Sequence, residues 1–173
     1  MTDNIKKFPL QFDNKYYINK PSGSEIAKIK YRIQNGEVYY VTLEKFKYAI
    51  EKGVAFSPGI LKGGLKAENW TQQQVFAIDI DNENQEAEIL TIDKVLSMCS
   101  EYGIKPSMYY ESYSHTVLKP RFRLIFVMDE IITIEEQRRN IIETLVSLFP
   151  QADQSCTNAD RIFFGTNKEV KIL

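Results

Sequence analysis

The chain has 173 residues, 43% of them hydrophobic, so it can bury a core in one domain. Its 22 lysines and arginines nearly balance 23 aspartates and glutamates; the net charge of −1 excludes an overall positive field, so any nucleic-acid binding must come from a local patch. Cys99 and Cys156 form no metal-binding pattern, which argues against a zinc site or a disulfide framework and indicates a reducing compartment. Without an apolar run of transmembrane length or a signal-peptide core, we expect a cytoplasmic protein with no membrane partner.

Residues 1–70 are expected to form a small N-terminal α/β lobe. An apolar stretch in this part of the chain is divided by Asn35-Gly36, a dipeptide that strongly favours a two-residue hairpin turn. The pattern therefore predicts that residues 29–33 pair with residues 37–41.

The lobe continues with a short helix and a basic loop. Thr42 is suited to cap the helix, and Gly53 is suited to end it. Residues 54–66 then read as a flexible, glycine-rich loop that contains Lys62 and Lys66. These two lysines either grip phosphate or are ordinary surface lysines of a mobile loop.

Residues 71–173 have a clearer pattern and are expected to form the core of the same domain. The predicted elements are a strand at 74–81, a helix at 91–102, strands at 106–113 and 121–128, a helix at 133–149 and a short strand at 161–164. This β-α-β-β-α-β order predicts an α+β, ferredoxin-like or RNA-recognition-like (RRM-like) core, with a four-stranded antiparallel sheet and two helices on one face.

The predicted strand 74–81 ends in two carboxylates, Asp79 and Asp81. Side chains alternate across a strand, so these two project from one face, opposite Ile78 and Ile80. Because like charges repel and cannot be buried unpaired without cost, the pair favours a divalent cation held by oxygen ligands, and removing either carboxylate is expected to leave the fold intact. The alternative is a strand that merely runs out into a polar loop.

The predicted topology gathers polar side chains at the edge of the sheet where that strand ends. Arg121 and Arg123 would share the open sheet face with the two aspartates, and the loops around the other strands end nearby. The side chains expected at this edge are Asp79, Asp81, Ser114, His115, Arg121, Arg123, Asp153, Asp160 and Arg161. Together they would suit a metal and triphosphate site, although each residue alone is compatible with a solvated loop or strand face.

Three motifs resemble the archaeo-eukaryotic primase (AEP) superfamily, in particular the primase-polymerase domains of phage and plasmid replication proteins. Residues 76–81, Phe-Ala-Ile-Asp-Ile-Asp, resemble its acidic motif, and Tyr113-Ser114-His115 resembles its histidine motif. Ala152-Asp153 followed by the segment 160–166 resembles the third motif, which joins an acid to an arginine-led strand ending in Gly-Thr. The resemblance covers about residues 54–168.

The resemblance implies specific roles for these residues. Asp79, Asp81 and Asp153 would be metal ligands, with Asp160 as the alternate third acid, and His115 would contact the phosphates of the incoming nucleotide. The expected nucleotide- and phosphate-binding residues are Ser114, His115, Arg121, Arg123, Arg161, Lys62 and Lys66.

The implied activity is that of a DNA-dependent nucleotidyltransferase. It would make or extend primers on a single-stranded DNA template by two-metal phosphoryl transfer from nucleoside triphosphates with Mg²⁺ or Mn²⁺, in the replication of a phage, plasmid or other mobile element. A replicative helicase or a C-terminal priming module is an expected partner.

Two alternatives remain open, an RRM-like nucleic-acid-binding module and a catalytically inactive primase-like subunit. Stacking of bases is not favoured, because the phenylalanines of the two central strands are expected to face the helices. A rolling-circle nuclease would need a pair of metal-binding histidines, and the chain has one histidine in total.

Overall fold

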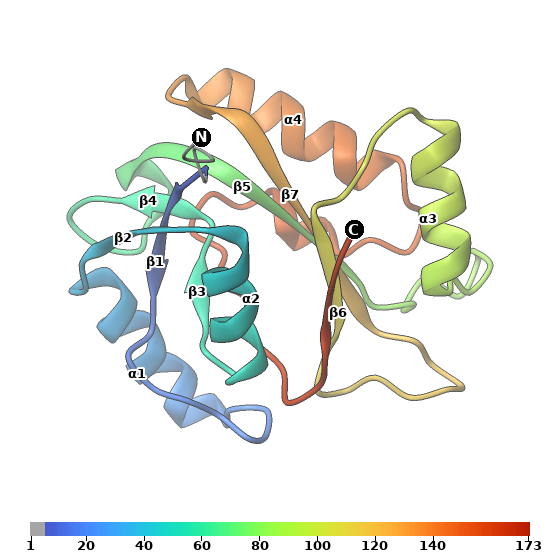
Figure 1. Cartoon of the computed structure of the whole chain (residues 1–173), viewed down its shortest axis with the longest axis horizontal. Helices are drawn as coiled ribbons and strands as arrows, with labels where there is room; N and C mark the ends of the chain where they lie inside the picture. The colour runs from blue at the N-terminus through green and yellow to red at the C-terminus, as the bar shows by residue number, and fades with distance from the viewer. Residues whose placement is uncertain (1–5) are drawn as a thin grey trace, which may run out of the picture.

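The computed structural model describes residues 6–173 as two antiparallel sheets and four α-helices (Figure 1). Residues 1–5, the start of the expected lobe, lie outside the described residues. The elements are β1 (Phe8–Phe12), α1 (Gly23–Gln34), β2 (Val38–Val41), α2 (Leu43–Glu51), β3 (Phe56–Ser57), β4 (Gly59–Leu61), β5 (Trp70–Ile80), α3 (Ile92–Glu101), β6 (Met108–Glu111), β7 (Phe122–Ile132), α4 (Glu135–Ser147) and β8 (Val170–Ile172). The sheet orders are β2-β1-β3 and β4-β5-β7-β6-β8, which agrees with the predicted α+β class.

Helix α1 occupies the place of the first strand of the predicted hairpin, so that prediction is wrong. Ile26, Ile29 and Ile33 recur at helical spacing, and the last two are fully buried. Asn35 is the C-cap of this helix, so Asn35-Gly36 ends a helix instead of turning a hairpin. Strand β2 pairs with β1 instead. A local turn signal could not reveal that a distant strand was available as the partner.

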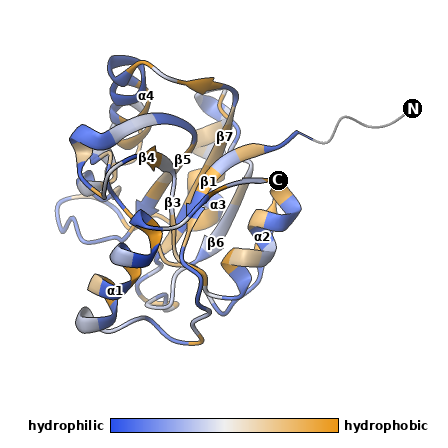
Figure 2. Ribbon diagram, turned by 90° about the vertical axis from the view of Figure 1, so that its left-hand side faces the viewer, coloured by the Kyte–Doolittle hydropathy of each residue, from blue (hydrophilic) through white to orange (hydrophobic). Residues whose placement is uncertain are grey.

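Threonine caps begin two of the helices, at Thr42 as predicted and at Thr91, which the prediction places inside the helix. Thr42 Oγ1 accepts a hydrogen bond from the N–H of Lys45 at the start of α2, and Thr91 Oγ1 accepts one from Lys94 at the start of α3, both at 3.3 Å. Hydrophilic and hydrophobic residues alternate along α2, as expected for a helix with one buried face (Figure 2). No helix within residues 6–173 is long and apolar enough to cross a membrane.

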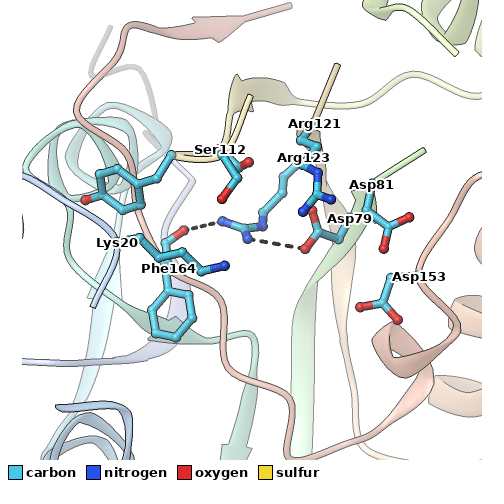
Figure 3. Close-up of a pocket in the computed structure, with 10 residues that line it drawn as sticks. Lys20, Asp79, Asp81, Ser112, Arg121, Arg123, Asp153 and Phe164 are labelled. Carbon is cyan, nitrogen blue, oxygen red and sulfur yellow. Dashed lines mark hydrogen bonds and ion pairs between the residues drawn. The ribbon is translucent and has the colours of Figure 1, made fainter. Parts of the chain in front are cut away.

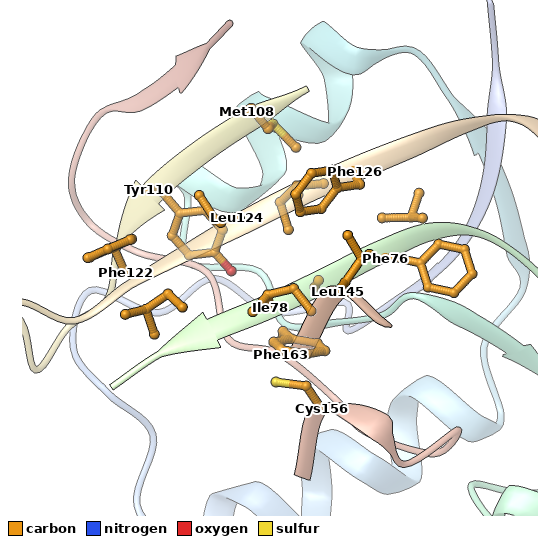
Figure 4. Close-up of a cluster of buried hydrophobic side chains, with 14 of the residues drawn as sticks. Phe76, Ile78, Met108, Tyr110, Phe122, Leu124, Phe126, Leu145, Cys156 and Phe163 are labelled. Carbon is orange, nitrogen blue, oxygen red and sulfur yellow. The ribbon is translucent and has the colours of Figure 1, made fainter. Parts of the chain in front are cut away.

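The centre of the larger sheet is the antiparallel pair of β5 and β7. Its register places Ile78 opposite Leu124 and Asp79 opposite Arg123. The side chains of the Ile78 face lie in a cluster with Leu145 of α4 (Figure 4), which confirms that this face is turned to a helix. The predicted alternation along both strands is therefore correct.

The opposite face of the pair is not open, contrary to the prediction. Val75, Ala77 and Ile125 lie on the same face as Asp79, and each is at most 2% exposed. They belong to a core cluster that continues into side chains of β1 and α2. Because three apolar side chains on this face require cover, the N-terminal part of the chain packs over it and leaves only the end with the acids accessible.

The predicted fourth strand, 161–164, does not enter the larger sheet. Phe163 instead forms an isolated bridge with Phe56 of β3, and their rings stack at 5.7 Å. The place beside β5 is taken by β4 from the N-terminal region, and β8 pairs with the outer edge of β6. The sheet is thus five-stranded. The predicted four-stranded sheet, with 161–164 as its last strand, is wrong because segments distant in sequence supply both edges.

The predicted flexible loop, 54–66, is largely ordered. Residues 54–61 are buried and contain β3 and β4, so only the turn at 62–66 corresponds to the expected exposed basic loop. Gly63 and Gly64 have φ values of +92° and +120°, which glycine adopts without strain. The two expected lysines, Lys62 and Lys66, lie on this turn.

Candidate active site

A pocket of about 180 Å³ lies where β5 ends, and it contains most of the predicted site residues (Figure 3). Its lining consists of Lys20, Asp79, Asp81, Ser112, Tyr113, Ser114, Arg121, Arg123, Asp153 and Phe164. Three carboxylates and two arginines from three separate parts of the chain therefore share one small volume. The expected convergence of acids and arginines at this edge is thus present in the structure.

Asp153 reaches the pocket because the chain runs briefly beside the end of β5. Ala152 forms a bridge with Ile80, and the N–H of Asp153 donates to the carbonyl of Asp79 at 2.9 Å. Asp160 instead lines a neighbouring pocket of about 400 Å³, together with Arg161. Of the two candidate third acids, the structure therefore brings Asp153 to the other carboxylates.

Asn82 turns the chain directly after the second carboxylate. Its φ of +54° is unusual for a residue other than glycine. The buried side chain accepts a hydrogen bond from the N–H of Leu90 and donates to the carbonyls of Leu90 and Pro120, at 2.6–3.0 Å. These three bonds fix the direction in which the chain leaves Asp81.

Asp79 is paired with an arginine that is itself buried. Arg123 Nη2 lies 3.2 Å from Asp79 Oδ2, and Nη1 donates to the carbonyl of Phe164 at 2.7 Å. The guanidinium also lies over the rings of Tyr110 and Phe163, at 5.6 and 5.8 Å from their centroids. Arg123 is only 8% exposed, so its first role is to neutralise and hold Asp79.

Asp153 has its own set of partners. Arg161 Nη2 donates to Asp153 Oδ2 at 2.8 Å, and the hydroxyl and N–H of Ser155 donate to the same carboxylate at 2.7 and 2.9 Å. Burial acts to raise the pKa of Asp153, but the Ser155 hydrogen bonds and the charge of Arg161 outweigh it and hold the pKa below its ordinary value. Asp153 is therefore ionised at neutral pH.

Asp81 lacks such support. Within residues 6–173, no basic side chain lies within 4.0 Å of its carboxylate, which accepts one backbone hydrogen bond, from Glu83. Burial, and then the negative charges of Asp153 and Asp79, raise the pKa of Asp81 above its ordinary value. An added cation would relieve this repulsion, so Asp81 is where the pocket has an uncompensated demand for positive charge.

The three carboxylates suit a hard divalent cation in their chemistry, since Mg²⁺ and Mn²⁺ prefer carboxylate oxygens. Their positions do not form a ready-made metal site. Among the described residues, no three histidine, cysteine, aspartate or glutamate side chains are gathered closely enough to hold a metal ion. The ion pairs account for this arrangement, because Arg123 and Arg161 hold the carboxylates of Asp79 and Asp153.

The histidine of the expected phosphate site lies beside the pocket and not in its lining. His115 Nδ1 accepts a hydrogen bond from the N–H of Arg121 at 3.1 Å, so its other nitrogen, Nε2, carries the proton in the neutral ring. Nε2 lies 3.3 Å from Glu111 Oε1. Ser114, from the same loop, does line the pocket.

Arg121 lines the pocket and is held at its rim. Its guanidinium is paired with Glu83, which also accepts a hydrogen bond from Lys119 at 2.6 Å. Glu83 carries one negative charge and is paired with two cations, Arg121 and Lys119. It therefore holds Arg121 close to the pocket without fully neutralising it, and part of the Arg121 charge remains available to an anionic ligand.

Two predicted basic residues lie elsewhere, and one basic residue was missed. Lys62 and Lys66 are on the exposed turn after β4 and do not line this pocket. Lys20 does line it. It comes from an irregular segment before α1 that has no periodicity or motif, so only the tertiary structure could reveal its place.

The pocket loop is tied to the N-terminal part of the chain. The hydroxyl of Tyr113 donates to the carbonyl of Tyr17 at 2.6 Å, and both groups pack against Gly53. Gly53 has φ +77°, and a Cβ there would collide with the Tyr17 carbonyl and the Tyr113 hydroxyl. Glycine is therefore required for the close approach that seats this loop.

Comparison with known proteins gives one distant likeness. No protein-family model matches the chain, and no curated protein matches it. Among solved structures, it is similar to the AEP domain of the primase-polymerase of cyanophage S-2L, with a TM-score of 0.48 and 12% sequence identity over 99% of this chain and 82% of that one. Because this likeness is weak, the case for a function depends on the residues of the pocket.

Proposed function

We propose that the chain is a metal-dependent nucleotidyltransferase of the primase-polymerase type, and that the pocket at the end of β5 is its active site. The observation that carries the proposal is the meeting of Asp79, Asp81 and Asp153 in one pocket with Arg121. Acids that gather beside arginines at the accessible end of a sheet suit a cation and a triphosphate better than they suit a stable core. The first and third of the motifs that resemble the primase superfamily supply the three carboxylates.

In this proposal Asp79, Asp81 and Asp153 hold the Mg²⁺ or Mn²⁺ ions. When bound, the ions would neutralise the triphosphate and stabilise the attacking and leaving oxygens of phosphoryl transfer. The protein contributes orientation. Arg123 holds Asp79, and Arg161 and Ser155 hold Asp153. Asp81 supplies the carboxylate that has no basic partner in the part of the chain that the structure describes.

The groups that would bind triphosphate oxygens line or flank the same pocket. Arg121 offers a planar fork that matches phosphate, Ser114 offers a hydroxyl, and Lys20 offers an ammonium group. His115 would donate from Nε2 once that atom leaves Glu111. Arg161 would act from the neighbouring pocket, and Lys62 and Lys66 would act through long-range charge only.

The proposed substrates are nucleoside triphosphates and a single-stranded DNA template, and the proposed products are primers or their extensions. The N-terminal lobe, residues 1–70, and the core, residues 71–173, would act as one catalytic domain. Replication of a phage, plasmid or other mobile element, with a helicase or a priming module as partner, is the setting that the motif resemblance implies.

A catalytically inactive primase-like subunit is the second candidate. The observation that favours it is that arginines occupy two of the three carboxylates, with no ready metal geometry among the described residues. An RRM-like module is not favoured, because the sheet face that would stack bases carries Val75, Ala77 and Ile125 and is buried.

Primer extension on a single-stranded template with Mg²⁺ or Mn²⁺ tests the proposal. The wild type should incorporate nucleotides, Asp81→Asn should abolish incorporation, and Asp153→Asn should be far more damaging than Asp160→Asn, whose carboxylate lies in the neighbouring pocket. Metal-dependent incorporation that survives in Asp81→Asn would disprove the assignment of this pocket. No incorporation by the wild type with either metal would favour the inactive subunit.

A further inference from the structure

The near-zero net charge conceals a strong asymmetry along the chain. Residues 1–70 contain twelve lysines and arginines against seven aspartates and glutamates, a net charge of +5. Residues 71–173 contain ten against sixteen, a net charge of −6. The N-terminal part is therefore a local basic region of the kind that a polyanion would meet.

Exposed tyrosines gather on this basic part. The exposed large hydrophobic side chains among the described residues include six tyrosines, and five of them belong to residues 1–70. Tyr16, Tyr39 and Tyr48 line one apolar groove of about 240 Å³ next to Lys45, and they are 72%, 47% and 60% exposed. Large aromatic rings left in water beside lysines are the composition of a surface that stacks nucleic-acid bases.

The charge along this groove is more positive than its composition suggests. Its one lining carboxylate, Asp13, is paired with Arg32, as is the nearby Glu25. Within residues 6–173, Lys45 and Lys52 have no carboxylate within 4.0 Å. Lys52 instead lies over the Tyr48 ring, 5.3 Å from its centroid.

Hollows that share lining residues connect the groove with the proposed active site. A second hollow, lined by residues 15–22 and Glu25, shares Tyr16 with the tyrosine groove. It shares Lys20 with the carboxylate pocket. A line of surface hollows therefore leads from Tyr48 through Tyr16 and Lys20 to the carboxylates.

We propose that this line, named here the tyrosine track and made of Tyr39, Tyr48, Lys45, Tyr16, Lys15 and Lys20, binds single-stranded nucleic acid. Bases stack on the tyrosines, and lysines neutralise the backbone. A single strand is the occupant, because stacking requires bases that are not paired in a duplex. That the bound nucleic acid leads toward the carboxylates rests on the proposed function. Its binding to the track does not.

The test measures binding without catalysis. A fluorescently labelled oligothymidylate of about 12 nucleotides, within the length range covered by single-strand binding folds, is titrated with protein in EDTA and without nucleotides. Tyr16→Ala and Tyr48→Ala should each weaken binding by about 5- to 160-fold, the range for loss of one stacked base. Tyr16→Phe and Tyr48→Phe should bind like the wild type. In Lys45→Ala the slope of log affinity against log salt should fall by about 0.7, the value for one contact to a single strand.

Matched controls come from exposed tyrosines outside the track. Tyr31 on α1 and Tyr40 on β2 are 65% and 58% exposed and line none of the hollows described above, so Tyr31→Ala and Tyr40→Ala should bind like the wild type. Three results would overturn the proposal. The controls could lose as much affinity as the track variants, the track variants could bind like the wild type, or a duplex of the same length could bind as tightly and depend on the same tyrosines. A circular dichroism spectrum of each variant confirms that it is folded.

The same titration separates this proposal from the proposed function. Asp81→Asn should bind the oligonucleotide at least as tightly as the wild type, because Asp81 lies outside the track and its replacement only removes a negative charge. Track variants that lose binding while no protein form incorporates nucleotides would support the track and refute the enzyme. If nucleotide incorporation depends on Asp81 but DNA binding is unchanged in Tyr16→Ala and Tyr48→Ala, the enzyme would be supported and the track refuted.

Discussion

Replacing Asp79 with asparagine should destabilise the fold, and the same change at Asp81 should not. The two residues are alike in sequence and differ only in surroundings. Asp79 neutralises Arg123, which is 8% exposed, whereas no basic side chain lies within 4.0 Å of Asp81 among residues 6–173. This corrects the expectation that either carboxylate could be removed without affecting stability.

The size of the effect at Asp79 follows from what Arg123 would lose. Removing one partner of a buried ion pair costs about 3 to 5 kcal/mol, because the other charge stays buried without compensation. Arg123 would keep its hydrogen bond to the Phe164 carbonyl and its place over Tyr110, so we expect a loss of about 3 kcal/mol, at the lower end of that range. For a chain of this size the midpoint of thermal unfolding should fall by about 6 to 12 °C.

Asp81→Asn is the matched control, because it also removes one carboxylate from the same pocket. Since burial and neighbouring charges raise the pKa of Asp81, its ionised form is disfavoured in the folded state, and the variant should be as stable as the wild type or more so. Urea unfolding followed by the fluorescence of Trp70, the one tryptophan of the chain, gives both free energies. Equal stability of Asp79→Asn and Asp81→Asn would refute the structural role of the Asp79–Arg123 pair.

Three further predictions concern acid pH, a glycine and phosphate binding. The folded-state pKa of Asp153 is lowered, so Asp153→Asn should be less stable than the wild type at neutral pH. Urea titrations should show this difference in stability vanish as the pH falls through the folded-state pKa. A difference that stays unchanged at low pH would contradict the stabilising role of the ionised Asp153 carboxylate. Gly53→Ala should lower the free energy of unfolding, measured in urea, by about 1 to 3 kcal/mol or more, because alanine there combines a positive φ with a collision at the Tyr17 carbonyl. The control Gly23→Ala should have little effect, because Gly23 is exposed and has open space around it. A nucleoside triphosphate titrated into the protein in a calorimeter, in the presence of Mn²⁺, should bind Arg121→Ala more weakly than the wild type by about 1 to 3 kcal/mol. Lys62→Ala should show a smaller loss that salt reduces further. The reverse order would mean that the phosphate site lies at the turn after β4.

Local patterns predicted several elements correctly because the physics behind them is local. Thr42 and Thr91 cap helices through hydrogen bonds three residues ahead, which needs no other part of the chain. Alternation along residues 75–81 likewise determines which side chains share a face. The grouping of Asp79 with Arg123 could therefore be predicted once two neighbouring strands were recognised.

Local patterns failed where the outcome depended on a distant partner. Asn35-Gly36 is compatible with a hairpin turn and with the end of a helix, and the presence of β1 as a partner for β2 decided between them. The open edge of β5 could accept several segments, and β4 and residues 151–153 occupy it in place of residues 161–164. A sheet edge offers the same backbone groups to any strand, so sequence periodicity cannot choose among them.

By itself, the sequence determined that two carboxylates share a strand face and that arginines, a histidine and further acids follow at intervals that a folded sheet could gather. Only the tertiary structure decided which of them meet, with which partners. It paired Asp79 with Arg123 and Asp153 with Arg161, and it brought Lys20 to the pocket from a segment without any pattern. Among residues 6–173 it left Asp81 without a basic partner. The physical reason is that burial and charge neutralisation depend on neighbours in space, and a linear chain does not specify those neighbours until it folds.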